Sequence, residues 1–467
     1  MGEMTAEARE VLALVNRGQL EEAAERWAVW RRATSYDPSL ALAHATGLVR
    51  QLAFPETIET ALAVISGEGG SISERLPAIH LICVAYTSLG FPDLARPFIE
   101  QIGLDDSQHC SDRCWRGRLL VQIGAIEEAL EWYEKVDKVF PGHPFMRSFR
   151  GYARRSLGDS AGFVDDLCAS TRDFFRAYYP DALCIDKMWE GEPLDGKTVA
   201  IAPLGGFGDY FQFIRFVPAL RQMGVSRMVA LADNQCHGLI KSAGVDQVEA
   251  FNVEAMESAD LWISTFGLER ARLFGASQAA PGAYLTAPDS LKAEQLAAEI
   301  RQKANGRPVM GICWHSDAQN GEFRSIHLHA LLPLFGMNEV HWVVFQRGFG
   351  LRRLVSTGLQ HGMTLIGEDM TFDENAALIE VLDGVVTIDC WLLHLAGALG
   401  VPTWLLLSRV MDARHENRER TSVLYPGTVT LARQPSNGDW NGAIRILMED
   451  LRTWLTTRPE HGGTANI

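Results

Sequence analysis

The chain has 467 residues, 47% of them hydrophobic and 22% charged, and a formal net charge of −15 at pH 7. This length exceeds what one hydrophobic core usually holds, so we expect a globular protein of several domains. The acidic balance argues against nucleic acid and anionic membranes as partners, because both are bound through clustered Lys and Arg.

No apolar run reaches the length of a bilayer span, so we expect no membrane span. Eight dispersed cysteines suit a reducing compartment and favour a cytoplasmic location. The close pair Cys110 and Cys114, preceded by His109, lacks the further ligands of a tetrahedral zinc site. We therefore predict no metal site.

The first third of the chain repeats. Gly90, Gly124 and Gly158 are 34 positions apart, and Gly18 lies about two further periods upstream. Glycine permits the tight turn between antiparallel helices, and Pro141 would end a helix. The pattern resembles the tetratricopeptide repeat, most clearly over residues 118–157. We predict an α-helical repeat domain over residues 1–165, whose concave surface would suit a peptide or protein.

Strands and helices alternate in the rest of the chain. The apolar strand runs are continuous, as in parallel sheets covered on both faces. The predicted strands are 198–203, 227–232, 246–251 and 259–265, and then 308–314, 340–346, 363–367, 384–389 and 402–407. Two such series predict two Rossmann-like α/β domains. The expected boundaries are a linker at 166–195, an N-terminal Rossmann-like domain at 196–300 and a C-terminal one at 301–467.

A glycine-rich loop follows the first strand of the first domain. Gly205, Gly206 and Gly208 precede Asp209 at the expected start of a helix. The spacing matches neither the dinucleotide fingerprint nor a Walker loop, so phosphate binding is only weakly indicated. Asp209 has two interpretations from its position alone, a helix cap or a catalytic carboxylate.

Three loops of the second domain also follow strands, where ligands bind in such sheets. Their candidate residues are Trp314, His315, Arg324, Ser325, Gln346, Arg347, Asp389, Cys390, Trp391 and His394. The helix after Asp389 could hold a pyrophosphate at its N-terminus. Structural alternatives stay open: His315 as a capping residue, Gln346 as a turn residue and His394 as a core residue.

The four loops together resemble the bacterial tetratricopeptide-repeat glycosyltransferases of the heptosyltransferase-like class, which are similar to glycosyltransferase family 9 and have the GT-B fold. The matching motifs are 206–209 with 212–213 and 215–218, Trp314 with 324–325, Gln346 with Gly348, Asp373 with 376–379, Asp389 with 394–400, and 438–440. The resemblance covers about residues 190–455.

The resemblance implies an acceptor-binding first domain, a second domain that binds a nucleotide-sugar, and inverting transfer without a metal or other cofactor. It makes Asp209 the candidate general base and the ten residues named above the candidate donor-binding set. It places the acceptor loop at Gly205, Gly206, Gly208, Gln212 and Arg215. One departure lies at residues 390–392, which read Cys-Trp-Leu where the family usually has small hydroxyl residues.

We therefore expect a glycosyltransferase that moves a sugar from a nucleotide-sugar to a protein or peptide presented by the repeats. Two alternatives remain. In one, the chain is a binding or scaffold protein whose transferase domain has lost turnover. In the other, it builds surface polysaccharide or lipid-linked glycan. The oligomeric state stays open, a homo-oligomer included.

Overall fold

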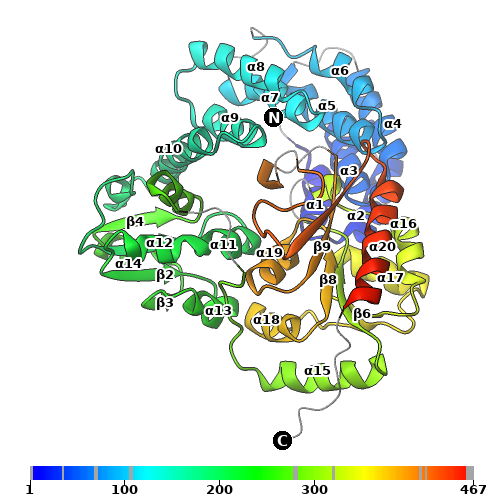
Figure 1. Cartoon of the computed structure of the whole chain (residues 1–467). Helices are drawn as coiled ribbons and strands as arrows, with labels where there is room; N and C mark the ends of the chain where they lie inside the picture. Colours follow the sequence, from blue (N-terminus) through cyan, green and yellow to red (C-terminus); the bar gives the residue numbers. More distant parts are fainter. Residues whose placement is uncertain are drawn as a thin grey trace, which may run out of the picture.

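The computed structural model describes residues 4–33, 36–67, 72–104, 109–276, 282–317, 321–409, 413–415 and 418–458. It contains a helical array followed by two α/β lobes, each built on a parallel sheet (Figure 1). This confirms the predicted fold class. None of the described helices combines the length and apolar character needed to cross a bilayer.

The helical array consists of successive antiparallel helices. They are α1 (Ala6–Asn16), α2 (Leu20–Ala33), α3 (Pro38–Arg50), α4 (Phe54–Ile65), α5 (Ile72–Ser88), α6 (Pro92–Ile99), α7 (Cys110–Gln122), α8 (Ile126–Val139), α9 (Pro144–Ser156) and α10 (Ser160–Tyr178). Gly18, Gly90, Gly124 and Gly158 lie between paired helices with φ of 73°, 91°, 89° and 85°. These left-handed conformations explain why the repeat places glycine there.

The first lobe has a four-stranded parallel sheet of order β3-β2-β1-β4 among the described residues. Its strands are β1 (Thr198–Ala202), β2 (Arg227–Leu231), β3 (Gln247–Glu249) and β4 (Leu261–Ser264). Its helices are α11 (Phe207–Phe213), α12 (Val217–Gln222), α13 (His237–Ser242), α14 (Val253–Ser258) and the 3₁₀ segment η4 (Phe266–Phe274). Helix α10 of the array packs on this sheet through Phe163, Val164 and Leu167.

The second lobe has a six-stranded parallel sheet of order β10-β9-β8-β5-β6-β7 among the described residues. Its strands are β5 (Val309–Cys313), β6 (His341–Val344), β7 (Thr364–Leu365), β8 (Gly384–Thr387), β9 (Thr403–Leu407) and β10 (Val429–Arg433). Its helices are α15 (Leu291–Ala304), α16 (Leu328–Phe335), α17 (Gly348–Thr357), α18 (Phe372–Glu380), α19 (Trp391–Ala398) and α20 (Trp440–Thr457). Strand β10 was not among the predicted strands.

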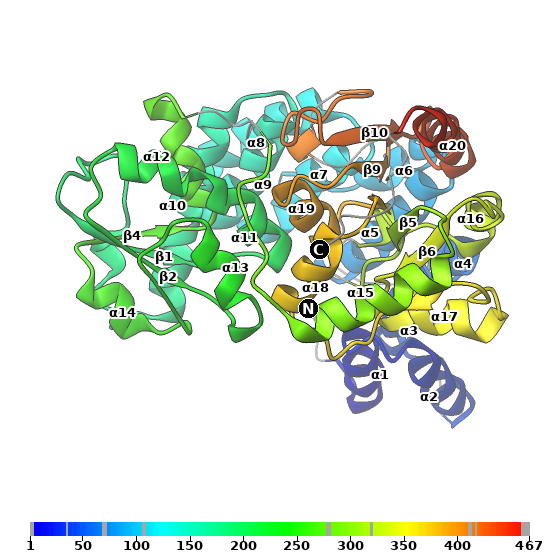
Figure 2. The same ribbon diagram turned by 60° about the horizontal axis from the view of Figure 1, so that its bottom comes forward.

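Helix α15 connects the lobes and lies along the second one (Figure 2), where it contacts α18, β5 and β6. The predicted boundary between residues 300 and 301 falls inside this helix. The division into domains stays a prediction, as does the linker at 166–195.

Helices α1–α10 together form an arch that touches both lobes (Figure 1). We call this part of the molecule the arch. At one end, Phe323 and Phe349 of the second lobe are buried among α1–α5. There, Nε2 of His315 lies 3.1 Å from the Arg50 carbonyl oxygen. At the other end, α9 and α10 contact the first lobe, where Arg155 pairs with Glu269.

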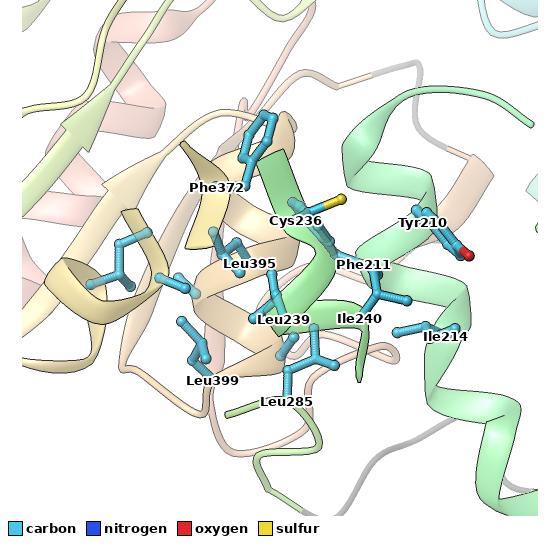
Figure 3. Packing of buried hydrophobic residues seen from close by; sticks show 14 of the residues in the cluster. Tyr210, Phe211, Ile214, Cys236, Leu239, Ile240, Leu285, Phe372, Leu395 and Leu399 are labelled. Atoms are coloured by element: carbon cyan, nitrogen blue, oxygen red, sulfur yellow. The ribbon is translucent and has the colours of Figure 1, made fainter. Parts of the chain in front are cut away.

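The two lobes also share a continuous hydrophobic core. Phe211 and Leu239 of the first lobe lie in one cluster with Phe372 and Leu395 of the second (Figure 3). The Asp373 carboxylate accepts the backbone N–H groups of residues 238 and 239 at 2.9 Å each, so it caps α13 from the opposite lobe. The lobes therefore meet over a packed interface.

Candidate functional site

A cavity of about 540 Å³ lies between the arch and the second lobe; we call it the arch cavity. The arch contributes Arg118, Val121, Gln122, Ile126, Tyr133, Phe145, Ser148, Phe149, Tyr152, Ser156 and Phe174, and the second lobe contributes Phe323, Arg324, Asp389, Leu407, Ser408, Ala413 and Arg414. The second-lobe residues follow strands β5, β8 and β9, except Leu407, which ends β9. The cavity thus lies where parallel sheets bind their ligands.

Asp389 follows β8 and is only 1% exposed. Nη1 of Arg324 donates to its Oδ2 at 3.2 Å. Its Oδ1 is 3.2 Å from Nε2 of His394 and 3.8 Å from Nη1 of Arg414. A carboxylate this deeply buried needs such pairing to remain charged.

Asp209 caps a helix, the first of the two interpretations that the sequence left open, and its catalytic role stays a prediction. Its Oδ2 accepts the Gly206 N–H at 2.8 Å, which caps the start of α11. Its Oδ1 lies 3.3 Å from Nη2 of Arg414 and so faces the second lobe. Arg414 therefore links the carboxylates of Asp209 and Asp389 across the lobes.

Two glycines of the first loop, Gly205 and Gly208, leave room for Asp209 and for the second lobe. Gly205 has φ of 91°, and a Cβ there would come within 2.5 Å of Asp209 Oδ2. A Cβ on Gly208 would come within 2.9 Å of Cδ2 of His394 and 3.4 Å of the Trp391 Cα. A side chain at Gly208 would therefore separate the first loop from α19, whereas one at Gly205 would collide with Asp209 of the same loop.

Sequence reasoning missed Arg414, because the segment after β9 has no recognisable motif. A cation in a loop after a parallel strand was the available signal, and it is weak. Tyr425 was missed for the same reason, although its hydroxyl lies 3.0 Å from Nδ1 of His394.

Most of the other predicted donor-binding residues hold the second lobe together. Gln346 is 3% exposed, and its Oε1 accepts the N–H groups of Trp314 and His315 at 3.1 and 2.8 Å. Its Nε2 donates to the carbonyls of His315 and Arg347 at 3.1 and 2.8 Å. Ser325 Oγ accepts the Ser316 N–H at 2.9 Å. None of these residues lines the arch cavity.

Arg347, Cys390 and Trp391 lie near the lobe interface. Arg347 donates from Nη2 to the Met370 carbonyl at 2.8 Å and lies over the Trp391 ring. The Trp391 ring centroid is 5.2 Å from that of Phe372, while Cys390 Sγ is 3.3 Å from a hydroxyl of β8. Their roles toward a donor stay predictions.

Gln212 and Arg215 of the predicted acceptor loop are buried. Arg215 donates from Nη1 to the Leu424 carbonyl at 2.6 Å and from Nη2 to the Tyr284 hydroxyl at 3.0 Å. These contacts join the lobes. A second cavity of about 430 Å³ lies beside the first loop and is lined in part by Gly205, Gly206, Asp233 and Asn234. It offers space on the predicted acceptor side.

The described residues contain no group of three or more His, Cys, Asp or Glu side chains that could hold a metal ion. Positive charge at the site comes instead from Arg324 and Arg414.

His394 is neutral at pH 7, because burial lowers its pKa from 6.5 to about 4. Between pH 6.5 and pH 4, this histidine therefore takes up a proton in the unfolded chain but not in the folded protein. We expect acidification from pH 6.5 to pH 4 to lower the free energy of unfolding by about 3 kcal/mol through this residue. Burial lowers the pKa of His80 to about 3, so it contributes in the same direction.

The measurement is urea denaturation between pH 4 and pH 7 for the wild type and for His394→Gln. The variant is expected to be less stable at pH 7 and to show a shallower pH dependence. Equal slopes for the two proteins would contradict the assignment of His394 as a neutral buried group.

The fold defines a helical-repeat protein with two Rossmann-like lobes, and the site adds a paired charge cluster at the strand ends. No protein-family model matches the chain, and no curated protein matches it in sequence. Over its lobes the chain is similar to the glycosyl transferase family 9 structure from Veillonella parvula, with 11% identity, TM-score 0.43, and coverage of 57% of this chain and 99% of that one.

Two further solved structures are similar to separate parts of the chain. The E. coli ADP-heptose heptosyltransferase II has 14% identity and TM-score 0.40, covering 56% of this chain and 98% of that one. Over the helical array the similarity is to MamA of MSR-1, with 16% identity and TM-score 0.26, covering 37% of this chain and 96% of that one.

Proposed function

We propose that this protein is an inverting, metal-independent glycosyltransferase that moves a sugar from a nucleotide-sugar to a protein or peptide acceptor. The observation that carries the proposal is the position of Arg414, which pairs with Asp209 of one lobe and Asp389 of the other at the edge of the arch cavity.

In this proposal Asp209 is the general base. It takes the proton from the acceptor hydroxyl or amide as that group attacks the anomeric carbon. The bond from the anomeric carbon to the diphosphate oxygen breaks with inversion, and the diphosphate leaves with its electron pair. Arg324 and Arg414 stabilise the growing negative charge. Donor binding would draw Arg414 toward phosphate and leave Asp209 free to accept a proton.

A thermal-shift screen of the full chain against a panel of nucleotide-sugars tests the donor. A donor at a concentration 100 times its Kd should stabilise the folded state by about 2.7 kcal/mol and raise the melting temperature. Absence of a shift with every nucleotide-sugar would contradict the proposal. With a radiolabelled donor, label in protein rather than in glycan supports the protein acceptor.

A second candidate function is a binding protein without turnover. It is favoured by the aromatic side chains that fill the lobe interface, where the Phe207 and Phe372 ring centroids are 4.2 Å apart and Trp391 lies against Phe372. In open α/β sheets such crevices usually hold ligands. Slow hydrolysis of the donor without acceptor would support the enzyme, and donor binding without hydrolysis or transfer would support the binding protein.

A further inference from the structure

The filled lobe interface raises the question of where a nucleotide would fit. Phe207, Phe372 and Trp391 occupy the region where the lobes meet, and Gly208 lies against α19. At the strand ends of the second lobe, the arch cavity offers a space of suitable size. Its volume of about 540 Å³ falls within the range typical of small-molecule sites.

The charge of the cavity points to an anionic ligand. Three arginines line it, Arg118, Arg324 and Arg414, with one carboxylate, that of Asp389. Arg414 also pairs with Asp209, which lies outside the lining, so three cations face two carboxylates. This local excess of positive charge occurs in a chain whose net charge is −15. Planar guanidinium groups pair well with phosphate oxygens.

The opposite wall is aromatic and belongs to the repeats. Phe145 and Tyr152 of α9 are 42% and 37% exposed, although large apolar rings are usually buried. Such rings offer flat surfaces on which a base can stack.

Two buried polar atoms in the lining lack a hydrogen-bond partner. They are the hydroxyl of Tyr133, a residue with 0% exposure, and Nε of Arg324. Both atoms are shielded from water, so a ligand in the cavity would reach them only after a side-chain movement.

We propose that the arch cavity holds the nucleoside diphosphate part of the donor, with the base against Phe145 and Tyr152 and the diphosphate against Arg324 and Arg414. This inference rests on the proposed function, because it places the donor of that reaction. It gives the repeats a role in donor binding, in addition to any contact with the acceptor. The sugar would then point toward Asp209, which Arg414 already contacts.

Isothermal titration of the full chain with ADP, GDP, UDP and inorganic pyrophosphate tests the placement. We expect at least one nucleoside diphosphate to bind the wild type. The double variant Phe145→Ala/Tyr152→Ala should weaken that binding about tenfold or more, because each stacked base contributes about 1–3 kcal/mol. Pyrophosphate affinity should stay within about twofold, and Arg324→Gln should weaken both ligands.

A matched control is Phe91→Ala/Tyr178→Ala, which removes the same two side chains from exposed positions of the array outside the cavity. It should leave every affinity unchanged. Recovery of affinity in Phe145→Tyr/Tyr152→Phe, which keeps both rings, would separate stacking from a loss of folding.

The inference is overturned if the nucleoside diphosphate binds the Phe145→Ala/Tyr152→Ala variant as tightly as it binds the wild type. If the same variant raises only the KM for a peptide acceptor, the cavity belongs to the acceptor, and the inference is overturned as well. If neither these nucleoside diphosphates nor any nucleotide-sugar of the thermal-shift panel binds the wild type, the proposed function itself fails, which is a different result.

Discussion

Asp209→Asn is expected to lower sugar transfer by about 10²–10⁴-fold, while the nucleotide-sugar still binds with nearly unchanged affinity. The range is that typical for removal of a general base. Asn keeps an oxygen that can accept the Gly206 N–H, which now reaches Asp209 Oδ2 at 2.8 Å, but it loses the negative charge. The variant therefore separates the capping role from the catalytic role.

Asp209→Ala completes the test, because it removes both the cap and the charge. Its loss of transfer should match that of Asp209→Asn, and its melting temperature should be lower, since a lost cap costs about 0.5–2 kcal/mol. Transfer by Asp209→Asn within a few-fold of the wild type would show that the carboxylate is only a cap. Donor affinity measured by titration calorimetry provides the control for site integrity.

Glu269→Ala is expected to destabilise the protein by about 3–5 kcal/mol, because it leaves a buried charge without its partner. Arg155 of α9 and Glu269 of the first lobe are 3% and 1% exposed, and they form an ion pair. Arg272 also donates to Glu269 at 2.8 Å. The pair joins the arch to the first lobe, so its loss should weaken that contact.

Urea unfolding of the full chain measures the effect. The double variant Arg155→Met/Glu269→Leu should regain most of the lost stability, because apolar residues of similar size can replace a buried pair. Asp186→Ala is the control, since Asp186 pairs with Arg176 where both side chains are exposed, and exposed pairs contribute about 0–1 kcal/mol. Equal effects of Glu269→Ala and Asp186→Ala would show that burial of the pair is unimportant.

Local patterns were sufficient to predict much of the fold. The 34-residue spacing of Gly90, Gly124 and Gly158 reports a backbone conformation that favours glycine, and all three have positive φ. Continuous apolar runs predicted the strands because both faces of each sheet are covered. Strand β10 was missed because Thr430 and Arg433 interrupt its apolar run, which reads Val-Thr-Leu-Ala-Arg.

The site was only partly predictable. Asp209 and Asp389 follow parallel strands of two different sheets, and topology places such positions at the strand ends where each sheet binds its ligands. The arch cavity joins residues 118–174 to residues 323–414, and no local pattern encodes that contact. Gln346 shows a second difficulty. Its side chain hydrogen-bonds the backbone of two loops in the structure. A polar side chain at a strand end gives the same sequence pattern whether it binds loops or a ligand.

The arch is anchored on both lobes, and the lobes share one core. A clamshell motion, by which many two-lobed enzymes admit substrate, would have to separate Phe211 from Phe372 and pull Arg155 away from Glu269. Such a hinge is therefore disfavoured in this molecule. Substrate entry and product escape would depend on side-chain movement at the mouths of the two cavities, so residues at those mouths would govern the rate of exchange.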